Sequence, residues 1–364
     1  MADGGSEDQI ARLRLIRSEN IGPVTYFQLL ARFGSASAAL AAIPDLAARG
    51  GGRAPKLAPR AAVEREIDHV ATIGARYLFL GQGLYPPLLA ELDSAPPALI
   101  VMGHLSLLEK PAVAMVGARN ASAAACRFAR QLAQKLGETG AAIVSGLARG
   151  VDTAAHDGSL ESGTIAVVAG GIDIFYPPEN EARQRAIAER GLLIAEQPPG
   201  TEPRARHFPY RNRIIAGLAH GTVVVEAAPN SGSLITARCA AEAGREVMAV
   251  PGSPLDPRAQ GCNQLIREGA TLVQNADDVM EAINPLRIRP FRQPERNYSA
   301  AEPGSDADER ARRAVTGLLN GTPVPVDELV RQSELSPATV QTVLLELELA
   351  GRLERHAGGR VSVV

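Results

Sequence analysis

The sequence predicts an α/β protein with a doubly wound, mostly parallel sheet, a small helical unit before it and a winged helix-turn-helix after it. Short apolar runs alternate with amphipathic stretches from residue 76 to residue 284, as a parallel sheet with helices on both faces requires. Apolar residues recur at helical spacing before this region, and three helical patterns and a glycine-centred hairpin follow it. The length of 364 residues allows two or three domains.

Residues 1–75 predict a helical unit of the helix-hairpin, or SAM-like, kind. Helical spacing over residues 10–48 is interrupted at residues 20–23 (NIGP), which predicts two short helices joined by a glycine turn. Such a hairpin either presents backbone N–H groups to a phosphate or packs as an ordinary helix-turn-helix unit. The glycine- and proline-rich residues 49–59 predict a loop or hinge.

Six apolar runs predict the core strands of a Rossmann-like domain over residues 76–284. Each run is short and rich in β-forming residues, and a turn and a stretch of helical length follow it. The runs are residues 112–116, 142–144, 165–168, 192–194, 222–225 and 246–250. Ligands of doubly wound folds bind outside the carboxyl ends of the strands, so the loops after these runs are the expected site.

Residues 285–307 predict a linker, because they are rich in proline, arginine and acids and show no periodicity. Residues 308–364 predict the winged helix, with helices near 309–319, 326–331 and 336–350 and a strand pair at 352–355 and 360–363. This unit holds eight acids and seven arginines, and Glu346 and Glu348 are expected on the polar face of its recognition helix. The sequence therefore favours a docking or dimer-stabilising module over a reader of duplex DNA.

Charge and cysteine content limit the function classes. The formal net charge is −2, so any nucleic-acid surface must be a local patch. Cys126, Cys239 and Cys262 are far apart, which excludes a metal knuckle or a dense disulfide framework and predicts buried thiols in a reducing compartment. The acidic start and the lack of an apolar run of ~20 residues predict a cytoplasmic protein with no membrane partner.

Two glycine-rich, basic loops after strands predict anion binding. In the first, Gly117 would let an anion approach the N-terminus of the next helix and Arg119 would supply charge. The second contains Ser145, Gly146 and Arg149. Neither loop is a Walker P-loop or a G-x-G-x-x-G fingerprint, and each by itself is more typical of an ordinary turn than of a phosphate site.

Residues 203–213 carry four arginines, two aromatic residues and no acid in eleven positions. Arginines neutralise phosphates, and aromatic rings stack on unpaired bases. The combination predicts a surface for single-stranded nucleic acid. A solvated basic loop is the alternative. The candidate binding residues of this segment are Arg206, Phe208, Arg211, Asn212 and Arg213.

Ser231, Gly232 and Ser233 open a helix after a later strand, where the hydroxyls either cap the helix or donate to a phosphate.

Four other residues with catalytic chemistry have structural alternatives. Asp152 and His156 share one helical face, but no third ligand stands at metal-site spacing, which favours a structural pair. Glu196 and Glu226 at strand ends are either carboxylates for catalysis or groups that cap a helix or tether a loop. No catalytic residue, metal or cofactor is predicted.

Taken in order, these motifs closely resemble the DNA-processing protein A (DprA, also called Smf) family. The matching segments are VGAR at 116–119, SGLARGVDTAAH at 145–156, GGIDIFYPPEN at 170–180, FPYRNRIIAGL at 208–218, SGSLITA at 231–237 and VPGS at 250–253. The likeness continues through residues 261–270 and covers about residues 85–283. The flanking helical unit and winged helix resemble optional parts of the family.

The resemblance implies a non-enzymatic protein of natural transformation that binds incoming single-stranded DNA, protects it and loads the RecA recombinase onto it. We also expect a homodimer through the Rossmann-like domain. The family's DNA-binding loops correspond to Arg119, Arg149, Phe208, Arg211, Asn212, Arg213 and Gly232.

Departures and alternatives accompany this resemblance. Ala118 stands where many members carry serine and Asn230 where a basic residue is common, so each departure removes one contact. One alternative is a nucleotide hydrolase of the phosphoribohydrolase type, although its P-G-G-x-G-T-x-x-E motif is absent. The other is a duplex-reading regulator that uses the winged helix.

Overall fold

The computed structural model describes residues 3–287, 307–356 and 358–364, which form two compact units. One unit is Met1–Arg65 together with Glu295–Val364, and the other is Glu66–Pro294. The first three residues of the predicted linker at 285–307 continue a helix, and nearly all of the rest lies outside the described residues.

The Glu66–Pro294 unit is built on a nine-stranded sheet within the described residues, in the order β1-β2-β6-β5-β4-β3-β7-β8-β9. Strands β3 to β9 are parallel to one another, whereas β2 pairs antiparallel with β1 and with β6. The strands are β1 (Arg76–Phe79), β2 (Ala98–Gly103), β3 (Ala112–Gly117), β4 (Ala142–Ser145), β5 (Thr164–Val168), β6 (Leu192–Ala195), β7 (Gly221–Val225), β8 (Glu246–Ala249) and β9 (Thr271–Leu272). All six predicted strands are confirmed, and β1, β2 and β9 were not predicted.

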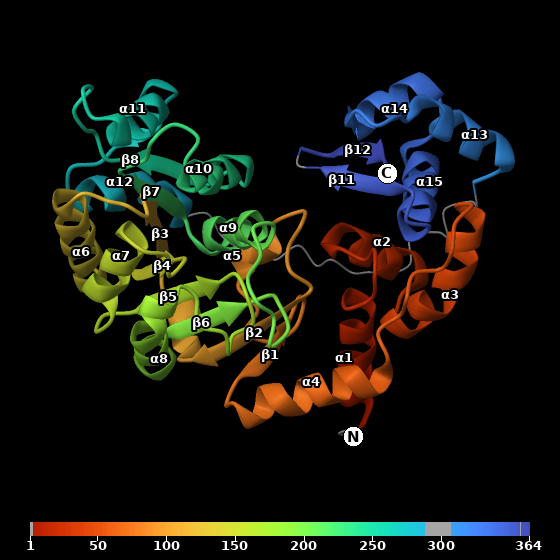
Figure 1. Ribbon diagram of the computed structural model, residues 1–364, viewed down its shortest axis with the longest axis horizontal. Helices are drawn as coiled ribbons and strands as arrows, with labels where there is room; N and C mark the ends of the chain where they lie inside the picture. The colour runs from red at the N-terminus through yellow and green to blue at the C-terminus, as the bar shows by residue number, and fades with distance from the viewer. Residues whose placement is uncertain (1–2, 288–306, 357) are drawn as a thin grey trace. The chain divides into compact units, whose positions relative to one another are not determined.

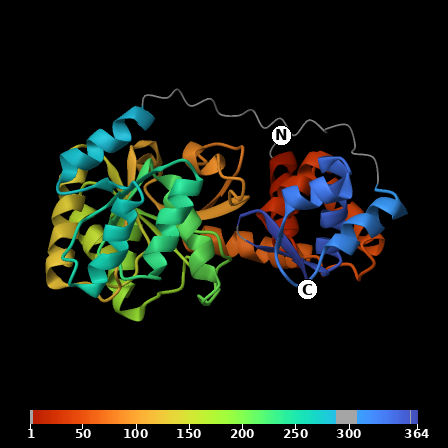
Figure 2. The same cartoon turned by 90° about the horizontal axis from the view of Figure 1, so that it is seen from above.

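Helices lie on both faces of this sheet (Figure 1 and Figure 2). Apolar side chains of α6, α7 and α12 pack against β3, β4, β7 and β8 in one core, which includes Val113, Met115 and Ile143. The helices are α5 (Pro87–Ala90), α6 (Ala123–Glu138), α7 (Val151–Ser159), α8 (Glu181–Arg190), α9 (His207–Leu218), α10 (Gly232–Glu242), α11 (Gln260–Arg267) and α12 (Ala276–Arg287). Helix α9 packs against α10.

The order of the strands reverses at β3. Strands β4, β5 and β6 extend the sheet on one side of β3, and β7, β8 and β9 extend it on the other. Loops that leave neighbouring strands in opposite directions open a crevice at the carboxyl edge of such a sheet. The predicted binding segments follow β3, β4, β6 and β7 and therefore lie at this edge.

The first unit begins with three helices where two were predicted: α1 (Asp3–Ile16), α2 (Pro23–Phe33) and α3 (Ala36–Arg49). Helix α4 (Arg60–Thr72) starts in this unit and ends in the other. Helix α2 ends because Gly34 adopts a left-handed conformation with φ of 75°. Helix α3 then begins where the Ser35 side chain accepts a hydrogen bond from the Ala38 N–H.

The same unit ends in a winged helix, as predicted. Its elements are α13 (Glu309–Leu318), β10 (Val324–Pro325), α14 (Val326–Ser333), α15 (Pro337–Leu349), β11 (Leu353–His356) and β12 (Arg360–Val363). The strands pair in the order β10-β12-β11.

The prediction that Glu346 and Glu348 lie on an open polar face of α15 was wrong. Glu346 is fully buried, and Arg312 donates to it at 2.8 and 3.1 Å. Glu348 accepts a hydrogen bond from Arg355 at 2.7 Å. A buried carboxylate needs such a partner because its desolvation is costly.

The prediction that the three cysteines are buried thiols holds only for Cys262. All three are free, and Cys126 and Cys239 are half-buried.

In the described residues no single helix is long and apolar enough to cross a membrane; α2 and α3 reach that length and apolarity only together, across a 103° bend.

Candidate nucleic-acid interface

A pocket opens at the carboxyl edge of the sheet, over β4 and β5. It encloses about 530 Å³ including its mouth. The loops after β3, β4 and β5 and the start of α9 contribute its walls. Its charged and aromatic lining consists of Arg119, Arg149, Tyr176, Phe208 and Arg211, and Gly146 lies at its wall.

Cationic and aromatic groups stack along the rim of this pocket. The Arg119 guanidinium lies 5.1 Å from the centre of the Phe208 ring. The Tyr176 ring lies on Phe208 with centres 5.6 Å apart and planes tilted by 52°. Tyr176 is 45% exposed, so its side chain is accessible at the pocket rim. Tyr176 was missed as a site residue, although it is an aromatic residue in a loop after a strand and belongs to the family-like segment at residues 170–180.

Arg211 forms part of the pocket wall from inside the fold. Its side chain is buried, and Nη1 donates to the Val167 carbonyl at 3.0 Å. Burial lowers the pKa of Arg211 to about 10, with Asp152 opposing that shift and Arg119 adding to it. A Cβ at Gly146 would overlap the Arg211 guanidinium, so this glycine is needed to admit the arginine. Arg211, a predicted DNA-binding residue, is therefore buried inside the fold, and its cation lies beside the pocket.

Asp152 balances this buried cation and shapes the loop after β4. Its Oδ2 accepts hydrogen bonds from the Gly146 N–H at 3.2 Å and the Ala148 N–H at 3.3 Å. Burial raises the pKa of Asp152, while the charge of Arg211 and the two backbone N–H groups oppose the rise. The carboxylate therefore has a structural role.

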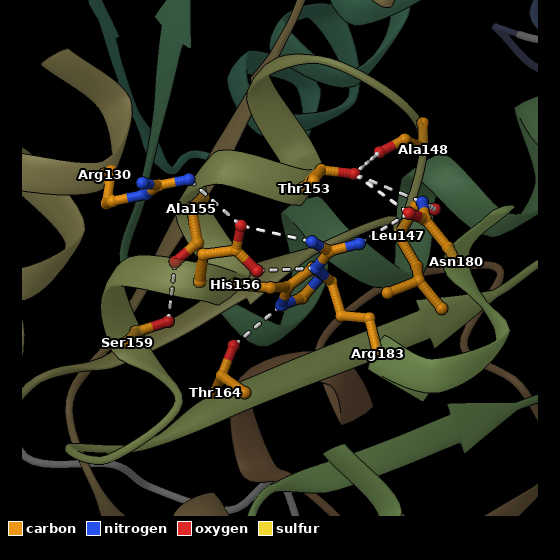
Figure 3. Close-up of polar contacts among 11 residues, drawn as sticks. Arg130, Leu147, Ala148, Thr153, Ala155, His156, Ser159, Thr164, Asn180 and Arg183 are labelled. Carbon is orange, nitrogen blue, oxygen red and sulfur yellow. Dashed lines mark hydrogen bonds and ion pairs between the residues drawn. The ribbon is translucent and has the colours of Figure 1, made fainter. Parts of the chain in front are cut away.

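Side chains of α7 and of the segment before α8 also fix the loop after β4 (Figure 3). Leu147 has an unfavourable φ of 55° for a residue with a side chain. Asn180 donates to the Leu147 carbonyl at 2.8 Å, and the Thr153 hydroxyl donates to the Ala148 carbonyl at 2.8 Å. Arg183 in turn donates to Asn180 at 2.6 Å. The strained backbone at the pocket wall is thus fixed by side chains of α7 and of the segment that starts α8.

His156 lies below this loop and forms no acid-base pair with Asp152 in the structure. Its Nδ1 is 2.7 Å from the Thr164 hydroxyl, and its Nε2 has no hydrogen-bond partner among the described residues (Figure 3). Burial, with a smaller contribution from the Arg183 charge, lowers the pKa of His156 to about 3. The described residues contain no cluster of potential metal ligands, so the geometry supports the structural interpretation.

The other two residues of the 211–213 motif point into the fold. Arg213 donates to Glu196 at 2.5 Å, and both side chains are largely buried. Asn212 is buried, and its amide donates to the Gly232 carbonyl at 3.3 Å. Helix α9 begins at His207, so residues 211–213 stand on its second turn and not in a loop. The exposed cations of the segment are Arg204 and Arg206.

The loop after β3 differs from the predicted anion site. A Cβ at Gly117 would overlap the Val225 carbonyl, so packing against β7 requires this glycine. Helix α6 begins only after its cap, Ser122, and its N-terminus is therefore not at Gly117. Glu226 tethers the loop: its carbonyl accepts from the Ala118 N–H and its Oε2 accepts from the Ser122 N–H, both at 2.7 Å.

The predicted serines have local partners. Ser145 is fully buried and its hydroxyl donates to the Met115 carbonyl at 2.6 Å, which places it inside the sheet and away from the pocket. Ser231 caps α10, and its Oγ lies 2.8 Å from the Oγ of Ser233, which is buried. Gly232 is exposed with open space around it. Arg149 is exposed and lies 3.6 Å from Glu179.

Fold and site together define a doubly wound α/β protein with a cationic, aromatic pocket at the carboxyl edge of its sheet. Residues 76–284 match the family described as DNA recombination-mediator protein A, and residues 6–68 match its DprA-like N-terminal HHH domain. Residues 299–359 match the DprA winged helix domain. The chain belongs to the DNA recombination-mediator protein A family.

Two curated relatives illustrate the similarity. The DNA processing protein DprA of Streptococcus pneumoniae is 48% identical over 198 residues, which are 54% of this chain and 70% of that protein. Protein Smf of Escherichia coli is 37% identical over 309 residues, which are 83% of this chain and 81% of that protein.

Two solved structures are also similar. The X-ray structure of DprA from Streptococcus pneumoniae has a TM-score of 0.58 and 42% identity, over 62% of this chain and 78% of that one. DNA processing protein A from Helicobacter pylori, whose structure is described as giving insights into a single-stranded DNA binding mode, has a TM-score of 0.52 and 30% identity. The match covers 58% of this chain and 96% of that one.

Proposed function

We propose that this protein binds single-stranded DNA at the pocket over β4 and β5. The observation that carries the proposal is the stack of Arg119, Phe208 and Tyr176 at the pocket rim, above the buried cation of Arg211. Arginines neutralise phosphates, and exposed aromatic faces accept unpaired bases of any sequence. The single-stranded DNA binding mode described for the Helicobacter pylori relative supports this proposal.

Preference for single strands tests this function. Binding of the full chain to a single-stranded oligonucleotide and to a blunt duplex of the same length is compared at matched salt, because the phosphate contribution depends on ionic strength. We expect tighter binding to the single strand, since the ring of Phe208 reaches only unpaired bases. Arg267→Ala, which removes an exposed cation of α11 that does not line the pocket, is the control and should bind as the parent does. Equal affinity for both DNAs contradicts the proposal.

The cellular role that we propose is protection of incoming DNA in the cytoplasm during natural transformation, followed by loading of RecA onto it by a homodimer formed through the Rossmann-like domain. Family membership supports this role. A test is the DNA-dependent ATPase of RecA on single strands first coated with a competing single-strand-binding protein. The parent should shorten the lag, and Arg119→Ala should not. Sedimentation of the free chain tests the dimer.

We further propose that the protein catalyses no reaction on nucleotides. The two carboxylates that follow strands support this proposal because both are engaged: Glu196 pairs with Arg213, and Glu226 accepts the Ser122 N–H and lies 3.8 Å from Arg258. Incubation with nucleoside monophosphates should release neither base nor phosphate. Release that Glu226→Gln abolishes would instead favour a phosphoribohydrolase.

A further inference from the structure

Helix α15 of the winged helix is covered on almost every side. Residues 340–350 are all buried or half-buried. One face of the helix, with Val343 and Leu347, belongs to the core of the winged helix. The opposite face, with Leu345 and Leu349, belongs to the core of the N-terminal helices. Both cores lie within one compact unit, and Figure 1 shows α15 beside α2 and α3.

The end of α3 approaches the backbone of α15 closely. Gly50 has φ of −70°, a right-handed conformation open to any residue. Its lack of a side chain is nevertheless needed, because a Cβ at Gly50 would overlap the Glu346 carbonyl oxygen. A Cβ at Gly52 would likewise overlap the Ala350 carbonyl. The close approach to α15, rather than the backbone conformation of residue 50 itself, therefore requires glycine there.

Polar groups match across the same contact. The Gln28 amide donates to the Gln341 side chain at 2.8 Å. Arg32 donates to the Thr342 hydroxyl at 3.3 Å. From the winged helix, Arg352 donates to the Gly50 carbonyl at 3.0 Å. Apolar burial, close backbone approach and paired polar groups are the marks of a specific interface.

In helix-turn-helix proteins the recognition helix lies in the major groove, where donors and acceptors on its outer face contact base edges. The outer face of α15 instead carries buried leucines, and the acids near it are paired with arginines of the winged helix. We propose that the N-terminal helices are the resident partner of this face. The two terminal domains then form one composite domain, and the winged helix does not bind duplex DNA through α15.

Hydrogen exchange of the full chain tests the proposal with the substitution Gly50→Ala. Alanine fits the local backbone but not the contact, so we expect amide exchange in both α3 and α15 to accelerate at least tenfold. Gly317→Ala in α13 is the control, because a Cβ there meets nothing within 4 Å. Unchanged exchange of α15 in Gly50→Ala, or equal acceleration in Gly317→Ala, overturns the proposal. Single-strand binding by the other unit should stay at the parent level, so this outcome is separate from the proposed function.

A second measurement does not depend on how Gly50→Ala folds. The full chain with Gln28→Cys and Gln341→Cys is treated with a short thiol-reactive crosslinker, with and without duplex DNA, and digested for mass spectrometry. We expect the 28–341 crosslink in both samples, and far less from a matched pair of Gln28→Cys with Gln332→Cys on α14. Loss of the 28–341 crosslink on adding duplex, or protection of α15 by duplex in the parent, would show that α15 is released to bind DNA and would refute the proposal.

Discussion

The side chains at the pocket rim offer two kinds of contact to a DNA strand: a charged contact to phosphate and a stacking contact to a base. Arg119 is an exposed cationic side chain next to Phe208, which is half-buried and uncharged. A phosphate contact and a base contact respond differently to salt, because only the former releases a counterion. The two contributions can therefore be measured one residue at a time.

Arg119→Ala should weaken single-strand binding and make the slope of log K against log salt shallower by about 0.7, the value for one phosphate on a single strand. Titrations of fluorescent oligonucleotide at four salt concentrations measure both quantities. An unchanged slope with weaker binding would mean that Arg119 acts by orienting Phe208 rather than by neutralising a phosphate.

Phe208→Ala should cost roughly 1–3 kcal/mol of binding and leave the salt slope unchanged, because a stacking partner carries no charge. Tyr176→Ala should behave in the same way, since its ring lies on Phe208 at the open rim. Titrations of fluorescent oligonucleotide at the four salt concentrations measure the affinity and the salt slope of both variants. If both variants bind as the parent does while Arg119→Ala fails, the pocket binds only the phosphate backbone.

Arg213→Ala should affect stability and not affinity. The substitution removes the largely buried ion pair with Glu196 at 2.5 Å, at a cost of about 1–3 kcal/mol in the free energy of unfolding. Thermal melting should show a lowered midpoint, and Arg213→Lys should recover part of it. A normal melting midpoint together with weaker DNA binding would instead assign Arg213 to the DNA contact.

At the scale of elements, α7 contains a buried group whose protonation opposes folding. The pKa of His156 is about 3 in the folded chain against an ordinary 6.5, because of burial. Between these values the unfolded chain binds more protons, so stability falls as pH drops below about 6.5, with a slope approaching 1.4 kcal/mol per pH unit. Above 6.5 the ring is neutral in both states and contributes nothing to the pH dependence.

The melting midpoint of the full chain between pH 7.5 and pH 5 tests this effect. His156→Asn keeps a polar group near the Thr164 hydroxyl but cannot take up the proton, so its midpoint should fall less than that of the parent over this range. Parallel falls in the two proteins would mean that other groups set the acid sensitivity.

Much of the architecture could be predicted because burial leaves a plain pattern. The six strands covered on both faces are continuous apolar runs, and the winged-helix elements begin at recognisable caps such as Ser336. Strand β9 has only two residues, and β1 is exposed at its start. Neither strand therefore shows a continuous apolar run that could predict it. The division into α2 and α3 was signalled by Gly34 and Ser35, and that signal was overlooked.

The site was predicted less completely, because spacing does not show which way a side chain points. Arg119 and Phe208 do line the pocket. Arg211, Asn212 and Arg213 were predicted to bind DNA, but they stand on the second turn of α9 and their side chains point inward. Glu346 was assigned to a polar face because nothing in the sequence of α15 reveals that Arg312 would meet it inside the fold.

At the scale of the whole molecule, the two compact units should unfold separately. Calorimetry of the full chain should show two transitions, because each unit has its own apolar core. Single-stranded DNA should raise only the transition of Glu66–Pro294, and Gly50→Ala should lower only the other. A single transition shifted by both treatments would show that the units are thermodynamically coupled.

The contact between α3 and α15 has a consequence for synthesis on the ribosome. Arg352 and Gly50, which are joined by a hydrogen bond, stand 302 residues apart in the chain. At about 5–20 residues per second, roughly 15–60 seconds pass between their emergence. During that interval Leu29 and Ile43 lack the leucines of α15 that complete their core. Nascent chains halted before α15 should therefore recruit a chaperone to their first helices, and chains extended through α15 should release it.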